Sequence, residues 1–138
     1  MCRIMSMTPA AEVASLPQRL RQKPWVLSLV YTGIIIYASL YANHGWRDAG
    51  LGLLDFMAGA WPRYWTWQDA LFNILAYLPL GFLLTLSPRH RPSPWARVLV
   101  PVLIGFLLSA AMEAIQTYIP GRVSSSLDLL FNTLGTIC

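Results

Sequence analysis

Two short segments of the chain pair a carboxylate with an amide four residues further on. Asp69-Ala-Leu-Phe-Asn73-Ile-Leu75 and Asp128-Leu-Leu-Phe-Asn132-Thr-Leu134 share the pattern D-x-L-F-N-x-L. On a helix, residues four apart lie on one face, one turn apart. Each Asp can cap the N-terminus of its helix, but capping does not explain an amide one turn deeper. We therefore interpret Asp69, Asn73, Asp128 and Asn132 as candidate site residues in two copies of one repeat.

A third polar pair lies inside a long apolar run. Glu113 and Gln116 are three residues apart and share a helix face. An ionisable residue inside a membrane span is costly, and it is by default a candidate for function. The alternative is a structural clamp that hydrogen-bonds one helix to another. We favour function for Glu113, with Gln116 as a binding residue.

Arg122 follows Pro120 and Gly121 in a short connection. It can be a solvated loop residue, or the two preceding residues can turn the chain so that Arg122 folds back over the polar cluster. There it could pair with Glu113 or Asp128, or hold a phosphate or carboxylate through a bidentate fork. We favour this second interpretation.

The composition indicates a chain that is solvated by lipid. Residues are 56% hydrophobic and 12% charged, whereas a soluble domain is about a quarter charged. The basic residues fall between apolar runs and do not form a stripe with interleaved aromatics, so nucleic acid is excluded as a partner. Four apolar runs predict an all-α, polytopic transmembrane helix bundle, with spans at 25–42, 70–86, 98–119 and 127–138. The last run is short, which predicts a truncated helix or one that a neighbouring segment completes.

The distribution of Lys and Arg predicts the orientation of these spans. Basic residues concentrate in residues 1–24 and in the 87–97 loop, and such residues favour the cytoplasmic side. The tail 1–24 is therefore predicted to be cytoplasmic, ahead of a membrane domain at 25–138. The segment 44–67 carries several Trp residues and is predicted to lie on the outer membrane surface.

This topology brings the polar pairs together. Both D-x-L-F-N-x-L segments open spans that run inward, as in a parallel repeat about the membrane normal, and the span that carries Glu113 and Gln116 runs outward. The six polar side chains are therefore expected at similar depth near the outer surface.

The sequence predicts no cofactor and no metal site. Cys2 and Cys138 stand at the two extremes, and His44 and His90 lie in opposite loops without ligand spacing. The carboxylates and amides could suit Mg²⁺ or Ca²⁺, but only as an open alternative. No GxSxG, HExxH or P-loop pattern is present.

The ordered set of these motifs resembles the VanZ-like family of small bacterial membrane proteins. The motifs that carry the resemblance are Asp69-x3-Asn73, Tyr77-x-Pro79-Leu-Gly81-Phe82, Glu113-x2-Gln116, Pro120-Gly-Arg122 and Asp128-x3-Asn132-x2-Gly135. The resemblance implies a bundle of four or five helices in the bacterial cytoplasmic membrane. It also implies a link to the cell envelope, since the founding member is associated with resistance to the glycopeptide teicoplanin. The Trp-rich segment 43–68 and the short last helix depart from the family pattern.

Two functions fit these residues. The first is binding or shielding of an envelope component, such as a lipid-linked precursor or a glycopeptide, by Asn73, Gln116, Arg122 and Asn132. The second is an intramembrane hydrolase or transferase in which Glu113, Asp69 and Asp128 supply the acid and the base. Glu113 is then the better acid because it is expected to lie deepest. A transporter is disfavoured, because no polar residue lines the inner half of any span.

Overall fold

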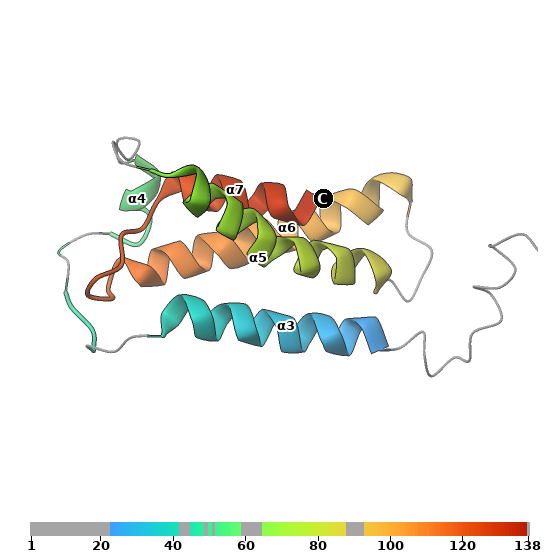
Figure 1. Cartoon of the computed structure of the whole chain (residues 1–138), viewed down its shortest axis with the longest axis horizontal. Coiled ribbons are helices and arrows are strands. Elements are labelled where there is room, and N and C mark those ends of the chain that lie inside the picture. Colours follow the sequence, from blue (N-terminus) through green and yellow to red (C-terminus); the bar gives the residue numbers. More distant parts are fainter. Residues whose placement is uncertain are drawn as a thin grey trace, which may run out of the picture.

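A computed structural model describes residues 23–41, 45–48, 50, 52–58, 65–87 and 93–137. These residues form five helices, namely α3 (Lys23–Leu40), α4 (Asp55–Ala58), α5 (Trp67–Leu86), α6 (Pro94–Gln116) and α7 (Ser126–Ile137), and no strand (Figure 1). The four longer helices lie side by side as a bundle. The prediction of an all-α four-helix bundle is thus confirmed. The tail 1–22, Trp61, both cysteines and both histidines lie outside the described residues.

Local signals fix where the two longest helices begin. The hydroxyl of Thr66 accepts a hydrogen bond from the backbone N–H of Asp69, and the Asp69 carboxylate accepts one from the backbone N–H of Thr66. This reciprocal capping box starts α5. The Ser93 hydroxyl accepts a hydrogen bond from the backbone N–H of Ala96 and caps α6, and Ser93 is followed by Pro94, which suits the first turn of a helix.

α7 packs between α5 and α6 through close approaches of their backbones. Cβ atoms added at Gly81 and at Gly135 would lie only 2.8 Å from Thr136 Cα and 3.0 Å from Ile74 Cα, respectively. Gly105 of α6 meets the side chain of Thr136. Small residues of this kind let helices approach closely in membranes. α5 and α7 begin at the same end of the bundle (Figure 1), as the predicted parallel repeat requires.

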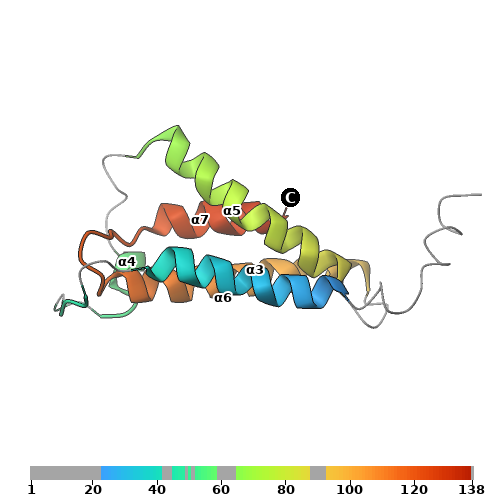
Figure 2. The ribbon, with the colours of Figure 1, turned by 60° about the horizontal axis from the view of Figure 1, so that its bottom comes forward.

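α3 is held against the bundle mainly through the middle and the C-terminal end of α5. Ser28 and Ser87 hydroxyls lie 3.2 Å apart, and the Tyr31 hydroxyl donates to the carbonyl of Ala76 at 3.0 Å. Leu75, the residue before Ala76, has a carbonyl without a donor in its own helix, because the residue four positions later is Pro79, which has no N–H. Towards its N-terminus, α5 diverges from α3 (Figure 2).

The bundle exposes apolar side chains along its helices. Exposed positions include Val30, Ile34 and Tyr37 of α3 and Leu99, Leu103 and Leu107 of α6. By length and hydropathy, α5 and α6 can cross a membrane, whereas α3 is apolar but shorter. An exterior of this kind is suited to lipid, where apolar surface carries no cost.

Two connections meet at one end of the bundle, here named the α4 end. The backbone N–H of Arg47 donates to the carbonyl of Tyr118 at 2.8 Å, so the segment 45–48 lies against the connection that follows α6. α4 lies at the same end (Figure 1). The segment 44–67 was predicted to lie on the outer membrane surface, and the structure places its residue Arg47 against Tyr118 at this end. Within the predicted surface segment 44–67, the described helix is only the four residues of α4, and Trp67 belongs to α5.

Candidate functional site

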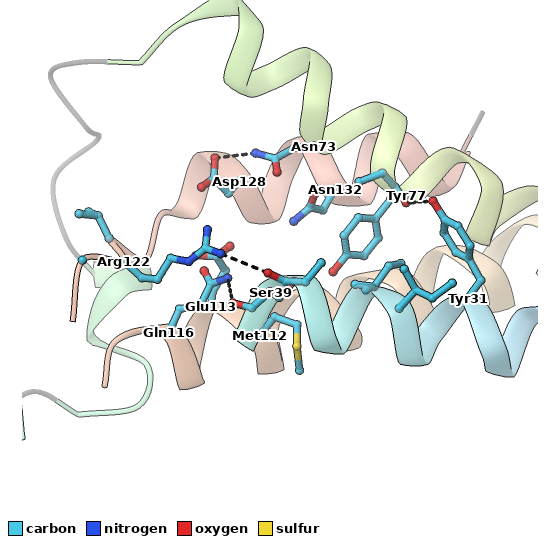
Figure 3. A pocket seen from close by; sticks show the side chains of 16 residues that line it. Tyr31, Ser39, Asn73, Tyr77, Met112, Glu113, Gln116, Arg122, Asp128 and Asn132 are labelled. Atoms are coloured by element: carbon cyan, nitrogen blue, oxygen red, sulfur yellow. Dashed lines mark hydrogen bonds between the residues drawn. The ribbon is translucent and has the colours of Figure 1, made fainter. Parts of the chain in front are cut away.

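A cavity of about 480 Å³ opens between the helices near the α4 end. All four long helices contribute to its wall (Figure 3). The polar side chains that line it are Tyr31, Ser39, Asn73, Tyr77, Glu113, Gln116, Arg122, Asp128 and Asn132. Six of the seven residues proposed from the sequence are among them.

Two polar atoms in this wall are deeply buried without a hydrogen bond among the described residues, although the Ser109 hydroxyl lies near one of them, that of Tyr77. The Tyr77 hydroxyl and Asn132 Oδ1 form no hydrogen bond within the described residues, although their side chains are only 3% and 5% exposed. The Asn132 amide nitrogen does donate to the Ser109 hydroxyl at 2.9 Å. Buried polar groups are nearly always paired, so an unpaired one needs an explanation.

The two D-x-L-F-N-x-L segments are joined by one hydrogen bond. Asn73 Nδ2 donates to Asp128 Oδ1 at 2.8 Å (Figure 3). The amide of the first segment thus pairs with the carboxylate of the second. Asn132, the equivalent of Asn73, pairs with Ser109 of α6 instead, so the likeness of the two segments does not extend to their contacts.

Glu113 holds the connection between α6 and α7. Its carboxylate oxygen Oε2 accepts a hydrogen bond from the backbone N–H of Ser125 at 2.8 Å, immediately before α7 begins. The Glu113 carbonyl accepts a second bond from the Ser124 hydroxyl at 2.6 Å. Glu113 is 3% exposed, and it lines the cavity as well. It therefore has a structural role and still faces the site.

Gln116 and Arg122 bind the last carbonyls of α3. Gln116 Nε2 donates to Ser39 O at 3.0 Å, and an Arg122 guanidinium nitrogen donates to Ala38 O at 3.1 Å. These carbonyls have no donor within their own helix. Side chains from α6 and from the following connection therefore cap α3.

The turn that aims Arg122 depends on Pro120 and Gly121. The Arg122 N–H donates to Ile119 O at 3.2 Å, and Gly121 has a φ of 81°. Pro at the second position and a positive φ at the third are features of a type II turn. The predicted fold-back of Arg122 over the cluster is observed. In the described part of the chain, however, Arg122 donates to a backbone carbonyl and forms no ion pair with Glu113 or Asp128.

Asp69 does not join the cavity. Its carboxylate accepts hydrogen bonds from the backbone N–H and the hydroxyl of Thr66, and its side chain is exposed. Capping, which the sequence allowed for this residue, fixes the Asp69 carboxylate at the start of its own helix, beside the cavity and not in it. Asp69 lines a neighbouring hollow of about 320 Å³ with Trp65, Phe72 and Phe131. That hollow shares Asn73, Arg122 and Asp128 with the cavity.

Several contacts at the site were missed from the sequence. Tyr77 lies four residues after Asn73, and Ser109 lies four residues before Glu113, so helical spacing could have identified both. Arg47 had no such signal. Its backbone N–H bonds to Tyr118 O, and its Nε donates to Thr117 O at 3.5 Å, beyond the end of α6. Within the described residues, no group of three or more His, Cys, Asp or Glu side chains could hold a metal ion.

The fold and the site define a small helical membrane protein with a polar cavity at one end of its bundle. The family description VanZ/LLP1 matches residues 5–138. Because the match covers nearly the whole chain, this protein belongs to the VanZ-like family. No curated protein and no solved structure matches the chain.

Proposed function

We propose that this VanZ-like protein binds a polar part of a cell-envelope component or glycopeptide in the cavity between α3, α5, α6 and α7. In this proposal it is a multi-pass protein of the bacterial cytoplasmic membrane, with its N-terminus in the cytoplasm. The α4 end, and with it the cavity, then faces the outer surface. The Lys and Arg bias of the tail 1–24 and of the 87–97 loop supports this orientation.

The unpaired groups in the cavity wall carry the proposal. A bound ligand would supply the donor that Asn132 Oδ1 lacks and a partner for the Tyr77 hydroxyl. In the absence of a ligand, these atoms bear the cost of burial without a hydrogen bond. This cost is reasonable at a site that is built for binding.

The charges of the cavity indicate what kind of polar group it suits. Among the described residues, the carboxyl groups of Glu113 and Asp128 face it together with the guanidinium group of Arg122. The hydroxyl and amide groups of a sugar or a peptide can donate to these carboxyl groups and accept from Arg122. Both groups are present in envelope precursors and in glycopeptides.

Substitution of Asn132 tests the proposal against a matched control. Asn132→Leu and Ser109→Ala both break the hydrogen bond between these residues, but only Asn132→Leu removes the unpaired oxygen. In lipid nanodiscs, we expect Asn132→Leu to weaken the binding of teicoplanin about tenfold more than Ser109→Ala does. Isothermal titration measures both affinities. Equal losses in the two variants would mean that the unpaired oxygen does not contact the ligand.

An acid–base enzyme is the second candidate, because two carboxylates from different helices line one cavity. Glu113→Gln separates the two functions. Its side-chain oxygen can still accept from the Ser125 N–H, so the connection to α7 is retained. A binding protein should keep its effect on teicoplanin susceptibility in cells, whereas loss of a general acid costs about 10²–10⁴-fold in rate. Loss of the cellular effect with an unchanged unfolding temperature would favour the enzyme.

The orientation has its own test in a chain with Cys2→Ser and Cys138→Ser. Val123→Cys at the α4 end and Trp95→Cys at the opposite end both replace exposed side chains. An impermeant maleimide should label Val123→Cys in intact cells and Trp95→Cys only after lysis. The reverse pattern would place the cavity on the cytoplasmic side.

A further inference from the structure

The cavity is open along the side of the bundle as well as at its end. Its exposed lining residues include Arg122 and Val123 at the α4 end, but also Ile34 and Ala38 in α3 and Ala76 in α5. Ile34 is 55% exposed, whereas the neighbouring Ile35 is 6% exposed and forms part of the floor. The mouth of the cavity is therefore a slot between α3 and α5.

The hydrogen bonds of α3 leave this slot open between two fixed points. The Tyr31 hydroxyl bonds to Ala76 O and closes the side nearer the opposite end of the bundle. At the α4 end, α3 is bound to α6 and to the following connection through Gln116 and Arg122. Between these points, the described residues contain no hydrogen bond from α3 to α5, and the two helices diverge (Figure 2).

The slot reaches the depth of the membrane hydrocarbon. Ala76 is the tenth residue of the 20-residue α5, about 14 Å along a helix that rises 1.5 Å per residue. The hydrocarbon core of a bilayer is about 30 Å thick. If α5 crosses the membrane, the slot at Ala76 faces lipid chains and not water.

We propose that the ligand is a membrane amphiphile that enters sideways through this slot. Its polar head lies among Asn132, Tyr77 and Arg122, and its hydrocarbon chain leaves between Ile34, Ala38 and Ala76 into the bilayer. The walls suit the two parts, because the slot is apolar and the interior of the cavity is polar. This inference rests on the proposed function and specifies its ligand class, since a water-soluble ligand would need only the opening at the α4 end.

Photolabelling of the intact protein tests the route. The protein is placed in vesicles of phosphatidylethanolamine and phosphatidylglycerol that contain a trace of monoglucosyl diacylglycerol with a diazirine in one acyl chain, so that the probe has a sugar head. After irradiation, mass spectrometry compares Ile34, Ala38 and Ala76 with Leu29 and Val30. These two controls are exposed on α3 but do not line the cavity. We expect about tenfold more label at the slot residues, as a bound chain would give.

Two tryptophan variants provide a matched control. Ala76→Trp fills the slot and should lower the label at Ile34 to the level at Leu29. Leu75→Trp alters an exposed position of α5 outside the cavity and should leave the label at Ile34 unchanged.

Equal labelling of Ile34 and Leu29 in the unaltered chain would overturn the proposal, and that comparison stands even if Ala76→Trp fails to fold. If the slot is not labelled but teicoplanin binding still depends on Asn132, sideways entry is wrong and the proposed site stands. If the slot is not labelled and teicoplanin binding does not depend on Asn132, both proposals are rejected.

Discussion

Gly81→Leu and Gly135→Leu are expected to disrupt the bundle, because each places a side chain where α5 and α7 touch. Even a Cβ at Gly81 would lie 2.8 Å from Thr136 Cα, and one at Gly135 would lie 3.0 Å from Ile74 Cα. Backbone atoms at these positions cannot turn aside as a flexible side chain can. Overpacking of this kind costs about 1–3 kcal/mol, and more where backbone must move. The fraction of folded protein and its unfolding temperature in detergent measure the effect.

Gly33→Leu is the matched control for these substitutions. Gly33 also lies within a helix, but a Cβ there meets no atom within 4 Å. Leucine is a better helix former than glycine, so this variant should unfold at the same temperature as the unaltered chain or slightly higher. If all three variants behave alike, the close crossing of α5 and α7 is not what holds the bundle together.

The crossing also matters for the site. Asn73 and Asp128, which are hydrogen-bonded to each other, lie on the two helices that cross. If α5 and α7 separate, this bond breaks and the wall between the cavity and the neighbouring hollow opens. We therefore expect Gly81→Leu and Gly135→Leu to lose ligand binding together with stability, unlike the substitutions within the cavity.

The helices of this protein were predictable because charges interrupt its apolar runs. Asp69 and Arg89 bracket the run that became α5, and the run at 98–119 lies within α6 and the turn that follows it. The convergence of Asn73, Glu113, Gln116, Asp128 and Asn132 followed from helix direction alone. Two helices that run one way and a third that runs the other bring such positions to one end.

The contacts of these residues were not predictable from the same reasoning. Gln116 and Arg122 bind backbone carbonyls of Ala38 and Ser39, and every residue carries a carbonyl, so no residue type marks the acceptor. The apolar residues of α3 that line the slot could not be identified from the sequence for a similar reason, because Ile34 is one of many exposed apolar residues. Asp69 lies beside the cavity and not in it because Thr66 supplies a local partner that the repeat pattern does not include.

The site residues divide into those that hold the structure and those that do not. Glu113, Gln116 and Arg122 each hydrogen-bond a neighbouring element, so substitutions that remove these bonds change stability and binding together. The Tyr77 hydroxyl and Asn132 Oδ1 hold nothing within the described residues. A substitution at Tyr77 is therefore expected to change ligand binding with the least change in stability.

Tyr77→Phe is expected to weaken ligand binding without any loss of stability. Removal of a buried hydroxyl that forms no hydrogen bond among the described residues relieves a desolvation cost of about 1–3 kcal/mol, so the unfolding temperature without ligand should stay the same or rise. If the ligand pairs with this hydroxyl, its affinity should fall about 5- to 150-fold, which corresponds to the same range of free energy. Thermal unfolding and titration with teicoplanin in nanodiscs measure the two effects on one preparation.

Tyr31→Phe is the matched control, because it removes a hydroxyl that donates to Ala76 O at 3.0 Å. The loss of about 0.5–1.5 kcal/mol of stability should lower the unfolding temperature of this variant. Equal destabilisation by both variants would show that the Tyr77 hydroxyl has a structural partner, and unchanged affinity in Tyr77→Phe would show that the ligand does not reach it.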